Sequence, residues 1–114
     1  NLPIYKVSHS KLFKLGITCL LIDVDGTLCT KSEKDYTKAM PYKERIETVN
    51  KLYEEGNEII IFTARGSLTG ENWEDLTKKQ LKDWNLKYSK LIFGKPGADY
   101  YIDDKAVDLF NWFK

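Results

Sequence analysis

Short apolar runs alternate with stretches of helical spacing along the chain. Four apolar runs of strand length lie at residues 17–22, 58–62, 91–93 and 100–102. Three stretches in which apolar residues recur at helical spacing cover residues 41–55, 72–84 and 106–113. Strands that alternate with helices through short connections predict an α/β domain with a central parallel sheet.

Residues at the ends of these segments support the same assignment. Pro41 is expected to start the first helix and Gly56 to end it. Asn72 is a candidate cap for the second helix. Residues 4–7 alternate weakly between apolar and polar, which is typical of an edge strand.

The first long strand ends on two carboxylates. Asp23 and Asp25 follow it directly, and Gly26 then allows a sharp turn. Two acids this close repel each other unless a cation, a proton or hydrogen-bond donors offset the charge. Mg²⁺ prefers oxygen ligands and keeps several waters, so we expect it here. The alternative is a solvated turn built from common turn residues.

The other three strands also end on polar residues. Thr63 closes the second strand, Lys95 follows the third, and Asp103 with Asp104 follows the fourth. The carboxyl ends of parallel strands share one edge of the sheet, so these side chains are expected to meet in one crevice. Phosphoryl transfer needs such a nucleophile, metal and set of donors. Taken singly, a strand threonine, a solvated loop lysine and a helix-capping acid are simpler explanations.

In this order, DxDGT, a strand-end Thr, a Lys and a late acidic pair resemble the haloacid dehalogenase-like (HAD) phosphohydrolases over residues 17–108. The resemblance implies a three-layer Rossmann-like fold with a central parallel sheet. It also implies a phosphoric monoester hydrolase that depends on Mg²⁺ and works through an aspartyl phosphate.

The resemblance also assigns roles to the acidic residues. Asp23 is then the nucleophile, while Asp25 protonates the leaving alkoxide and later activates water. Asp104 would bind Mg²⁺ together with the Asp23 carboxylate and the Asp25 main-chain carbonyl. Asp103 would be a direct ligand or would support one.

Two further pairs of residues complete the expected site. By the same resemblance, Thr63 and Lys95 would hold the phosphoryl oxygens. Lys95 lies only eight residues before Asp103, closer than in many relatives. Arg65 and Asn72 follow the second strand and are candidates for recognising the leaving group, although Asn72 fits a helix cap equally well.

Length and motif spacing predict one domain over residues 1–114, because 114 residues with 42% hydrophobic content can bury a single core. The stretches between the motifs leave no room for a cap domain, so the chain resembles capless members of the family. Residues 30–40 are polar and form a candidate flap over the site. A neighbouring copy in a homo-oligomer is another way to cover it.

Charge and motif detail favour a small substrate. Eighteen basic and 17 acidic residues give a net charge of +1, without the basic track that nucleic acid requires. The motifs around residues 62–66, 94–96 and 101–106 look most like small bacterial phosphatases of capsule or surface-polysaccharide biosynthesis, which implies a phosphorylated sugar or polyol. The alternatives are a nucleic-acid 3′-phosphatase and a non-catalytic or receiver-like domain that binds phosphate.

Two cysteines form neither a disulfide framework nor a zinc pattern. Cys19 is expected to be buried in the first strand, and Cys29 to be an unreactive thiol near the turn. The sequence contains no signal peptide and no apolar stretch long enough for a bilayer, so a cytoplasmic location and no membrane contact are expected.

Overall fold

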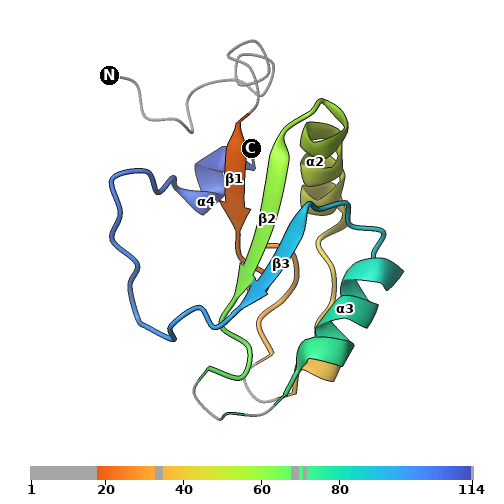
Figure 1. Cartoon of the computed structure of the whole chain (residues 1–114), viewed down its shortest axis with the longest axis vertical. Helices are drawn as coiled ribbons and strands as arrows, with labels where there is room; N and C mark the ends of the chain where they lie inside the picture. Colours follow the sequence, from red (N-terminus) through yellow and green to blue (C-terminus); the bar gives the residue numbers. More distant parts are fainter. Residues whose placement is uncertain (1–17, 33–34, 68–69, 71, 114) are drawn as a thin grey trace.

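A computed structural model describes residues 18–32, 35–67, 70 and 72–113 (Figure 1). Its strands are β1 (Cys19–Ile22), β2 (Glu58–Thr63) and β3 (Lys90–Phe93). Its helices are the 3-10 turn η2 (Tyr36–Lys38), α2 (Lys43–Glu54), α3 (Glu74–Asp83) and the short α4 (Leu109–Trp112). All strand pairs are parallel, in the order β1-β2-β3. The predicted α/β class with a central parallel sheet flanked by helices is confirmed.

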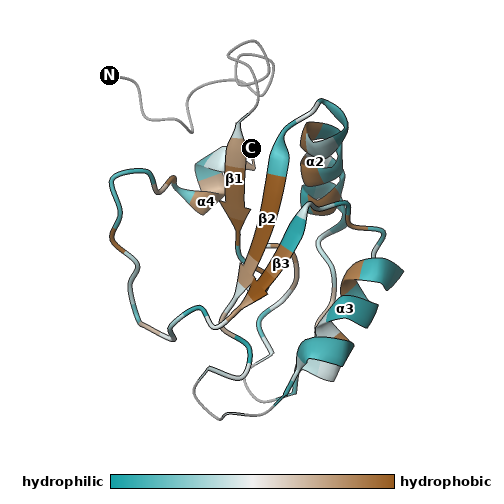
Figure 2. Ribbon diagram, viewed as in Figure 1, coloured by the Kyte–Doolittle hydropathy of each residue, from teal (hydrophilic) through white to brown (hydrophobic). Residues whose placement is uncertain are grey.

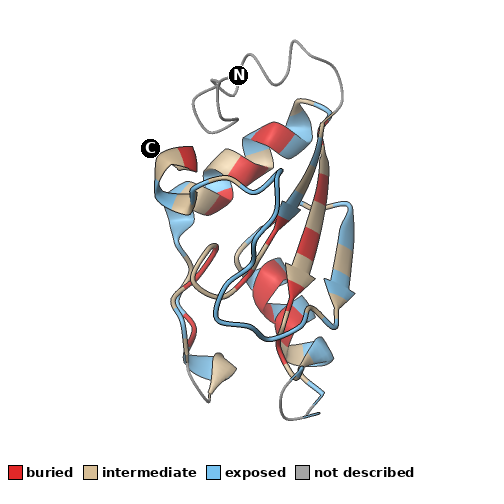
Figure 3. Ribbon diagram, turned by 90° about the vertical axis from the view of Figure 1, so that its left-hand side faces the viewer, coloured by how far each residue is buried: buried red, intermediate tan, exposed pale blue. Residues whose placement is uncertain are grey.

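The sheet buries one face in the main core. Alternate residues of β2 are buried, namely Ile59, Ile61 and Thr63. Ile59 and Ile61 belong to a hydrophobic core that also takes in residues from α2, α3 and α4. Figure 3 shows α2 and α4 on the same side of the sheet, and Figure 2 shows apolar residues along the strands with hydrophilic ones on the outer surfaces of α2 and α3. On the opposite face, Leu21 and Ile92 are largely exposed.

Helix α2 forms for the reason its sequence indicates. Its buried stripe consists of Ile46, Val49 and Leu52, spaced three residues apart. The helix ends before Gly56, whose φ of +100° is favourable only for glycine. The predicted range of 41–55 therefore exceeds the observed helix by two residues at the start and one at the end.

Helix α3 buries polar as well as apolar residues. Thr77 and Gln80 lie beside Leu81 on the face that turns to the core. Asn72 precedes the helix, and its Oδ1 accepts a hydrogen bond from the Glu74 N–H at 2.9 Å. This is the interaction that the capping interpretation of Asn72 requires, although Trp73 occupies the cap position itself.

The end of the chain differs from the prediction. The strand expected at 100–102 is not formed: Tyr100 is 85% exposed and Ile102 is 97% exposed. The segment from Gly94 to Asp108 instead runs as an open loop from β3 to α4 (Figure 1). The predicted strand is therefore wrong: aromatic and branched residues favour a strand, but a strand also needs a hydrogen-bonded neighbour, which local sequence does not specify.

The last helix is also shorter than the expected 106–113. It begins after Asp108, whose carboxylate accepts a hydrogen bond from the Phe110 N–H at 2.9 Å. Cys19 is exposed rather than buried, because its side of β1 is not covered by described residues. The edge strand predicted at 4–7 lies outside the described residues. In the part of the chain described here, no helix has the length and apolar character that a membrane crossing requires.

Candidate active site

The turn after β1 carries the two aspartates, Asp23 and Asp25. Val24 lies between them and is fully buried, so its backbone is fixed in the core. The turn is closed by hydrogen bonds from the Gly26 N–H to the Cys29 carbonyl and from the Leu28 N–H to the Val24 carbonyl, each 2.8 Å long. Gly26 has a φ of +82°, which a side chain would oppose. The sequence signal for a sharp turn is confirmed.

An arginine from α2 supports this turn from outside. Arg45 donates from Nη1 to the Thr27 carbonyl at 3.1 Å and to the Gly26 carbonyl at 3.4 Å. Its guanidinium lies 4.5 Å from the ring centre of Tyr42 and 5.4 Å from that of Phe113. Sequence reasoning missed Arg45, because nothing local links a helix arginine to carbonyls 18 residues earlier.

Three of the predicted strand-end residues come together. Lys95 Nζ lies 3.8 Å from Asp23 Oδ1 and 4.2 Å from the ring centre of Tyr101. The Lys95 N–H also donates to the Thr63 carbonyl at 3.1 Å, which fixes the loop start against the end of β2. The Thr63 side chain is buried, and its hydroxyl accepts from the Arg65 N–H at 3.1 Å. The short spacing between Lys95 and the acidic pair thus does not prevent Lys95 from reaching Asp23.

The environment of Asp23 opposes its negative charge. Burial is the largest effect and raises the pKa of the carboxyl above its usual value, and Asp25 adds to the rise. The ammonium of Lys95 and the Val24 N–H act in the opposite direction. A carboxylate that is partly desolvated and faces a second acid is stabilised by a cation, so the chemistry of Asp23 fits a role as a metal ligand.

The late acidic pair does not join this group. Asp103 and Asp104 are exposed on the loop before α4, and the Asp103 carboxylate accepts from the Lys105 N–H at 2.9 Å. That backbone hydrogen bond, helped by the Asp104 side chain, lowers the pKa of Asp103. Within residues 18–32, 35–67, 70 and 72–113, no three acidic, histidine or cysteine side chains are grouped to hold a metal. Asp23 is therefore not joined by the acidic partners expected from the fourth strand, because this strand is not formed.

Arg65 occupies a different place from the one its sequence position indicates. Its side chain is 0% exposed. Nε donates to Asp25 Oδ2 at 3.0 Å, and Nη2 donates to Asp25 Oδ1 at 2.9 Å. Nη1 donates to Thr77 Oγ1 at 3.0 Å and to Gln80 Oε1 at 2.6 Å. In this structure the guanidinium is thus engaged with Asp25 and α3, and the expected contact between Arg65 and a leaving group stays a prediction.

The same cluster reaches the candidate flap. Gln80 Nε2 donates to the Tyr36 carbonyl at 2.6 Å, and the Tyr36 ring centre lies 4.6 Å from the Arg65 guanidinium. Tyr36 also meets Trp73 edge to face at 4.9 Å. The two ends of residues 30–40 pair through the Thr30 N–H and the Met40 carbonyl at 2.9 Å. The segment is therefore attached to α3 next to Asp25.

Cys29 lies against the turn after β1. It is fully buried, and its Sγ lies 3.6 Å from both the Val24 carbonyl oxygen and Asp25 Oδ1. Burial, followed by the nearby charge of Asp25, raises the pKa of the thiol to about 12. A cysteine that stays protonated is a poor nucleophile, which agrees with the expected lack of reactivity of Cys29.

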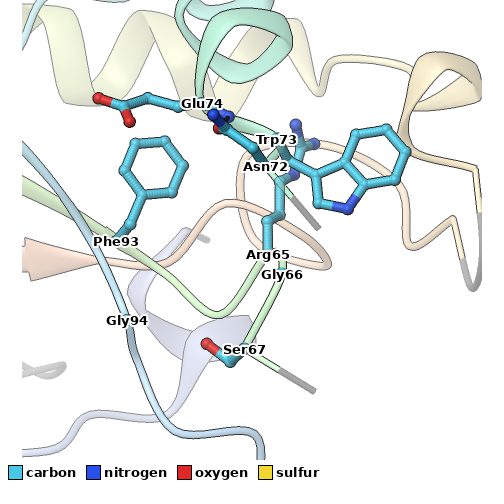
Figure 4. Close-up of a pocket in the computed structure, with 8 residues that line it drawn as sticks. All are labelled: Arg65, Gly66, Ser67, Asn72, Trp73, Glu74, Phe93 and Gly94. Carbon is cyan, nitrogen blue, oxygen red and sulfur yellow. Dashed lines mark hydrogen bonds between the residues drawn. The ribbon is translucent and has the colours of Figure 1, made fainter. Parts of the chain in front are cut away.

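Two hollows lie side by side, with Arg65 in the wall of both. The first, about 220 Å³, is lined by Asp23, Asp25, Lys31, Ser32, Tyr36, Ala64 and Arg65. The second, about 210 Å³, is lined by Arg65, Gly66, Ser67, Asn72, Trp73, Glu74, Phe93 and Gly94 (Figure 4). Figure 4 shows the rings of Phe93 and Trp73 on either side of Asn72. The second hollow thus offers two aromatic surfaces with polar side chains between them.

Comparisons with known proteins place this geometry among solved structures. A structural-genomics protein from Vibrio cholerae is 30% identical over 85% of this chain and 88% of that chain, with a TM-score of 0.76. A chain of the Pnkp1/Rnl/Hen1 complex is 20% identical over 78% of this chain and 32% of that chain, with a TM-score of 0.55. The D,D-heptose 1,7-bisphosphate phosphatase from B. bronchiseptica, solved with magnesium and phosphate, is 14% identical over 73% of this chain and 52% of that chain, with a TM-score of 0.54. No protein-family model and no curated protein matches the chain.

The fold defines the class of the chain: an α/β core with a three-stranded parallel sheet flanked by helices, similar in structure to the core of HAD-like phosphatases. It belongs to the same family as the Vibrio cholerae protein. The other two similarities, at 20% and 14% identity, show the fold alone.

Proposed function

We propose that this protein is a Mg²⁺-dependent phosphoric monoester hydrolase that uses Asp23 as its nucleophile. The observation that carries the proposal is the meeting of Asp23, Lys95 and Thr63 at the carboxyl ends of three parallel strands, with Lys95 Nζ 3.8 Å from Asp23 Oδ1. The HAD-like core supports it, since a phosphatase of that core is among the similar structures. A single domain without a cap agrees with the short connections around the site.

The chain's own residues account for two half-reactions. Asp23 attacks phosphorus, the bond from phosphorus to the leaving oxygen breaks, and Asp25 gives that oxygen its proton. In the second half-reaction Asp25 takes a proton from water, the water oxygen attacks phosphorus, and Asp23 is released with inorganic phosphate. Lys95 offsets the charge on the phosphoryl oxygens, and we assign the Thr63 hydroxyl, which accepts from the Arg65 N–H, as a donor to one of them.

A divalent cation fits beside Asp23, because this carboxylate is partly desolvated and lies close to a second acid. The Asp23 carboxylate and the Asp25 main-chain carbonyl would hold it, with Asp104 as a further ligand and Asp103 beside it. When bound, Mg²⁺ supplies positive charge that stabilises the transferring phosphoryl group. The role of Asp104 requires the loop between Lys95 and α4 to bring this residue to Asp23.

We also propose that the leaving group is a sugar or polyol, as in surface-polysaccharide precursors. The second hollow supports this class. Aromatic rings such as Trp73 and Phe93 suit the apolar faces of a sugar ring, while Asn72 and Ser67 suit its hydroxyls. Asn72 uses its Oδ1 to accept from the Glu74 N–H, which leaves the amide N–H₂ to donate toward the hollow.

The test is phosphate release from sugar phosphates, polyol phosphates, nucleotides and 3′-phosphorylated oligonucleotides, with Mg²⁺ or with EDTA. We expect turnover of the sugar or polyol phosphates with Mg²⁺ and none with Asp23→Asn. Asp83→Asn is the matched control, because Asp83 is an exposed acid whose partner is Lys79 on the surface of α3. Release from the oligonucleotides alone would favour a nucleic-acid 3′-phosphatase. No release by the folded wild-type protein would overturn the hydrolase proposal.

A further inference from the structure

The hydrogen bonds of Arg65 are those of a residue that fixes the orientation of the Asp25 carboxylate. Its Nε and Nη2 engage one oxygen each of the Asp25 carboxylate, at 3.0 and 2.9 Å. A guanidinium that grips both oxygens fixes the plane of the carboxylate, not only its position. We propose that Arg65 is the positioning residue for Asp25, and that Gln80 and Thr77 in turn position Arg65.

The Arg65–Asp25 pair differs from a surface ion pair in how far it is buried. The Arg65 side chain is 0% exposed, whereas the Asp25 side chain keeps 21% exposure. The Arg65 side chain is therefore shielded from solvent, whereas the Asp25 carboxylate is partly exposed at the hollow that both residues line with Asp23. Arg65 thus holds the Asp25 carboxylate from the buried side, and the exposed part of the side chain faces the hollow. A proton donor needs this arrangement when the leaving oxygen arrives from one direction.

The third side chain nitrogen of Arg65 points the opposite way, into α3. Nη1 donates to Gln80 Oε1 at 2.6 Å and to Thr77 Oγ1 at 3.0 Å, and both residues are buried. The other end of the Gln80 amide, Nε2, donates to the Tyr36 carbonyl at 2.6 Å. Rotation of Arg65 away from Asp25 would break several buried hydrogen bonds at once, so the guanidinium is held rigidly.

The inference rests on the proposed function and makes a prediction that a purely structural role does not. An alkoxide leaves only if it is protonated, whereas p-nitrophenolate leaves without help. A displaced Asp25 should therefore harm alkyl phosphates selectively. We expect Arg65→Lys, which keeps the charge but loses the two-pronged grip, to lower kcat/KM about 10- to 100-fold for glycerol phosphate. For p-nitrophenyl phosphate we expect a loss below about 3-fold, because correct acid catalysis contributes little there.

Arg45 provides the matched control. It also binds the turn after β1, but through the Gly26 and Thr27 carbonyls, and not through the Asp25 carboxylate. Arg45→Lys loosens the same turn without changing what holds the carboxylate. We expect it to lower kcat/KM for the two substrates by the same factor.

Gln80→Met keeps the proposal testable if Arg65→Lys fails to fold. It removes the side chain that holds Arg65 and leaves Arg65 with Asp25, so a smaller loss with the same substrate selectivity is expected. Far-UV circular dichroism establishes that each variant is folded. Equal losses on both substrates for folded Arg65→Lys and Gln80→Met, with the wild type active, would overturn the positioning role alone. No turnover by the wild type would overturn the proposed function, and with it this role.

Discussion

Replacing Asp25 by alanine removes the counter-charge of a buried arginine as well as the proposed proton donor. Within the described residues, Asp25 is the only acid that Arg65 contacts, and the Arg65 side chain has no exposure to water. The variant therefore leaves a buried guanidinium without its counter-charge. Breaking a buried pair in this way costs about 3–5 kcal/mol, against a total stability of about 5–15 kcal/mol for an ordinary domain.

The reverse substitution should cost less. Arg65→Met leaves Asp25 unpaired, but the Asp25 side chain is 21% exposed, so water can take over part of the hydrogen bonding. In the double variant neither charge is present. We expect its loss of unfolding free energy to be smaller than the sum of the two single losses by about 1–3 kcal/mol.

Urea unfolding at neutral pH in EDTA, followed by tryptophan fluorescence and circular dichroism, measures all three variants. Asp83→Ala is the control, because the Asp83–Lys79 pair is exposed and should change stability by less than about 1 kcal/mol. The reasoning fails if Asp25→Ala costs no more than this control at an unchanged denaturant slope. It also fails if the two single losses simply add.

Two further predictions follow from the titrating groups. The folded-state pKa of Asp23 is raised, so its ionised form destabilises the metal-free fold above that pKa, and the penalty disappears as pH falls toward the unfolded value of 3.8. Asp23→Asn should therefore raise the melting temperature in EDTA at pH 7 and give little gain near pH 4; a gain that grows on acidification would contradict this. Cys19 is exposed and Cys29 is buried with a thiol pKa of about 12, so iodoacetamide at pH 8 should alkylate Cys19 at least about tenfold faster. Peptide mass spectrometry measures both rates, and equal labelling of folded protein would contradict the described burial.

The sequence predicts the middle of the fold well. The three strands and the helices α2 and α3 were found because their apolar periods are long enough to be distinctive. The strand predicted at 100–102 is not formed, because aromatic and branched residues favour a strand without specifying a neighbour for it. Cys19 was misjudged for a related reason: a continuous apolar run does not reveal that only one face of the strand is covered.

The site divides in the same way. Asp23, Thr63 and Lys95 could be placed because each stands at a strand end, and parallel strands gather their ends. Arg65 also follows a strand, but sequence position does not show whether its side chain turns outward or inward. A signal was present in α3, where Thr77 and Gln80 interrupt an apolar stripe. Polar residues on a buried face need hydrogen-bond partners, and an arginine whose side chain points into the core can be such a partner.

The bonds around Asp25 join parts of the chain that are synthesised at different times. Arg65 lies 40 residues after Asp25, and Gln80 lies 44 residues after Tyr36. The turn that carries Asp23 and Asp25 therefore leaves the ribosome well before the residues that hold the Asp25 carboxylate. Contacts of such sequence separation form late, after the loops between them have closed. Under the proposed function, activity therefore depends on the finished fold, and cleavage within α3 is expected to abolish it without changing Asp23 or Asp25.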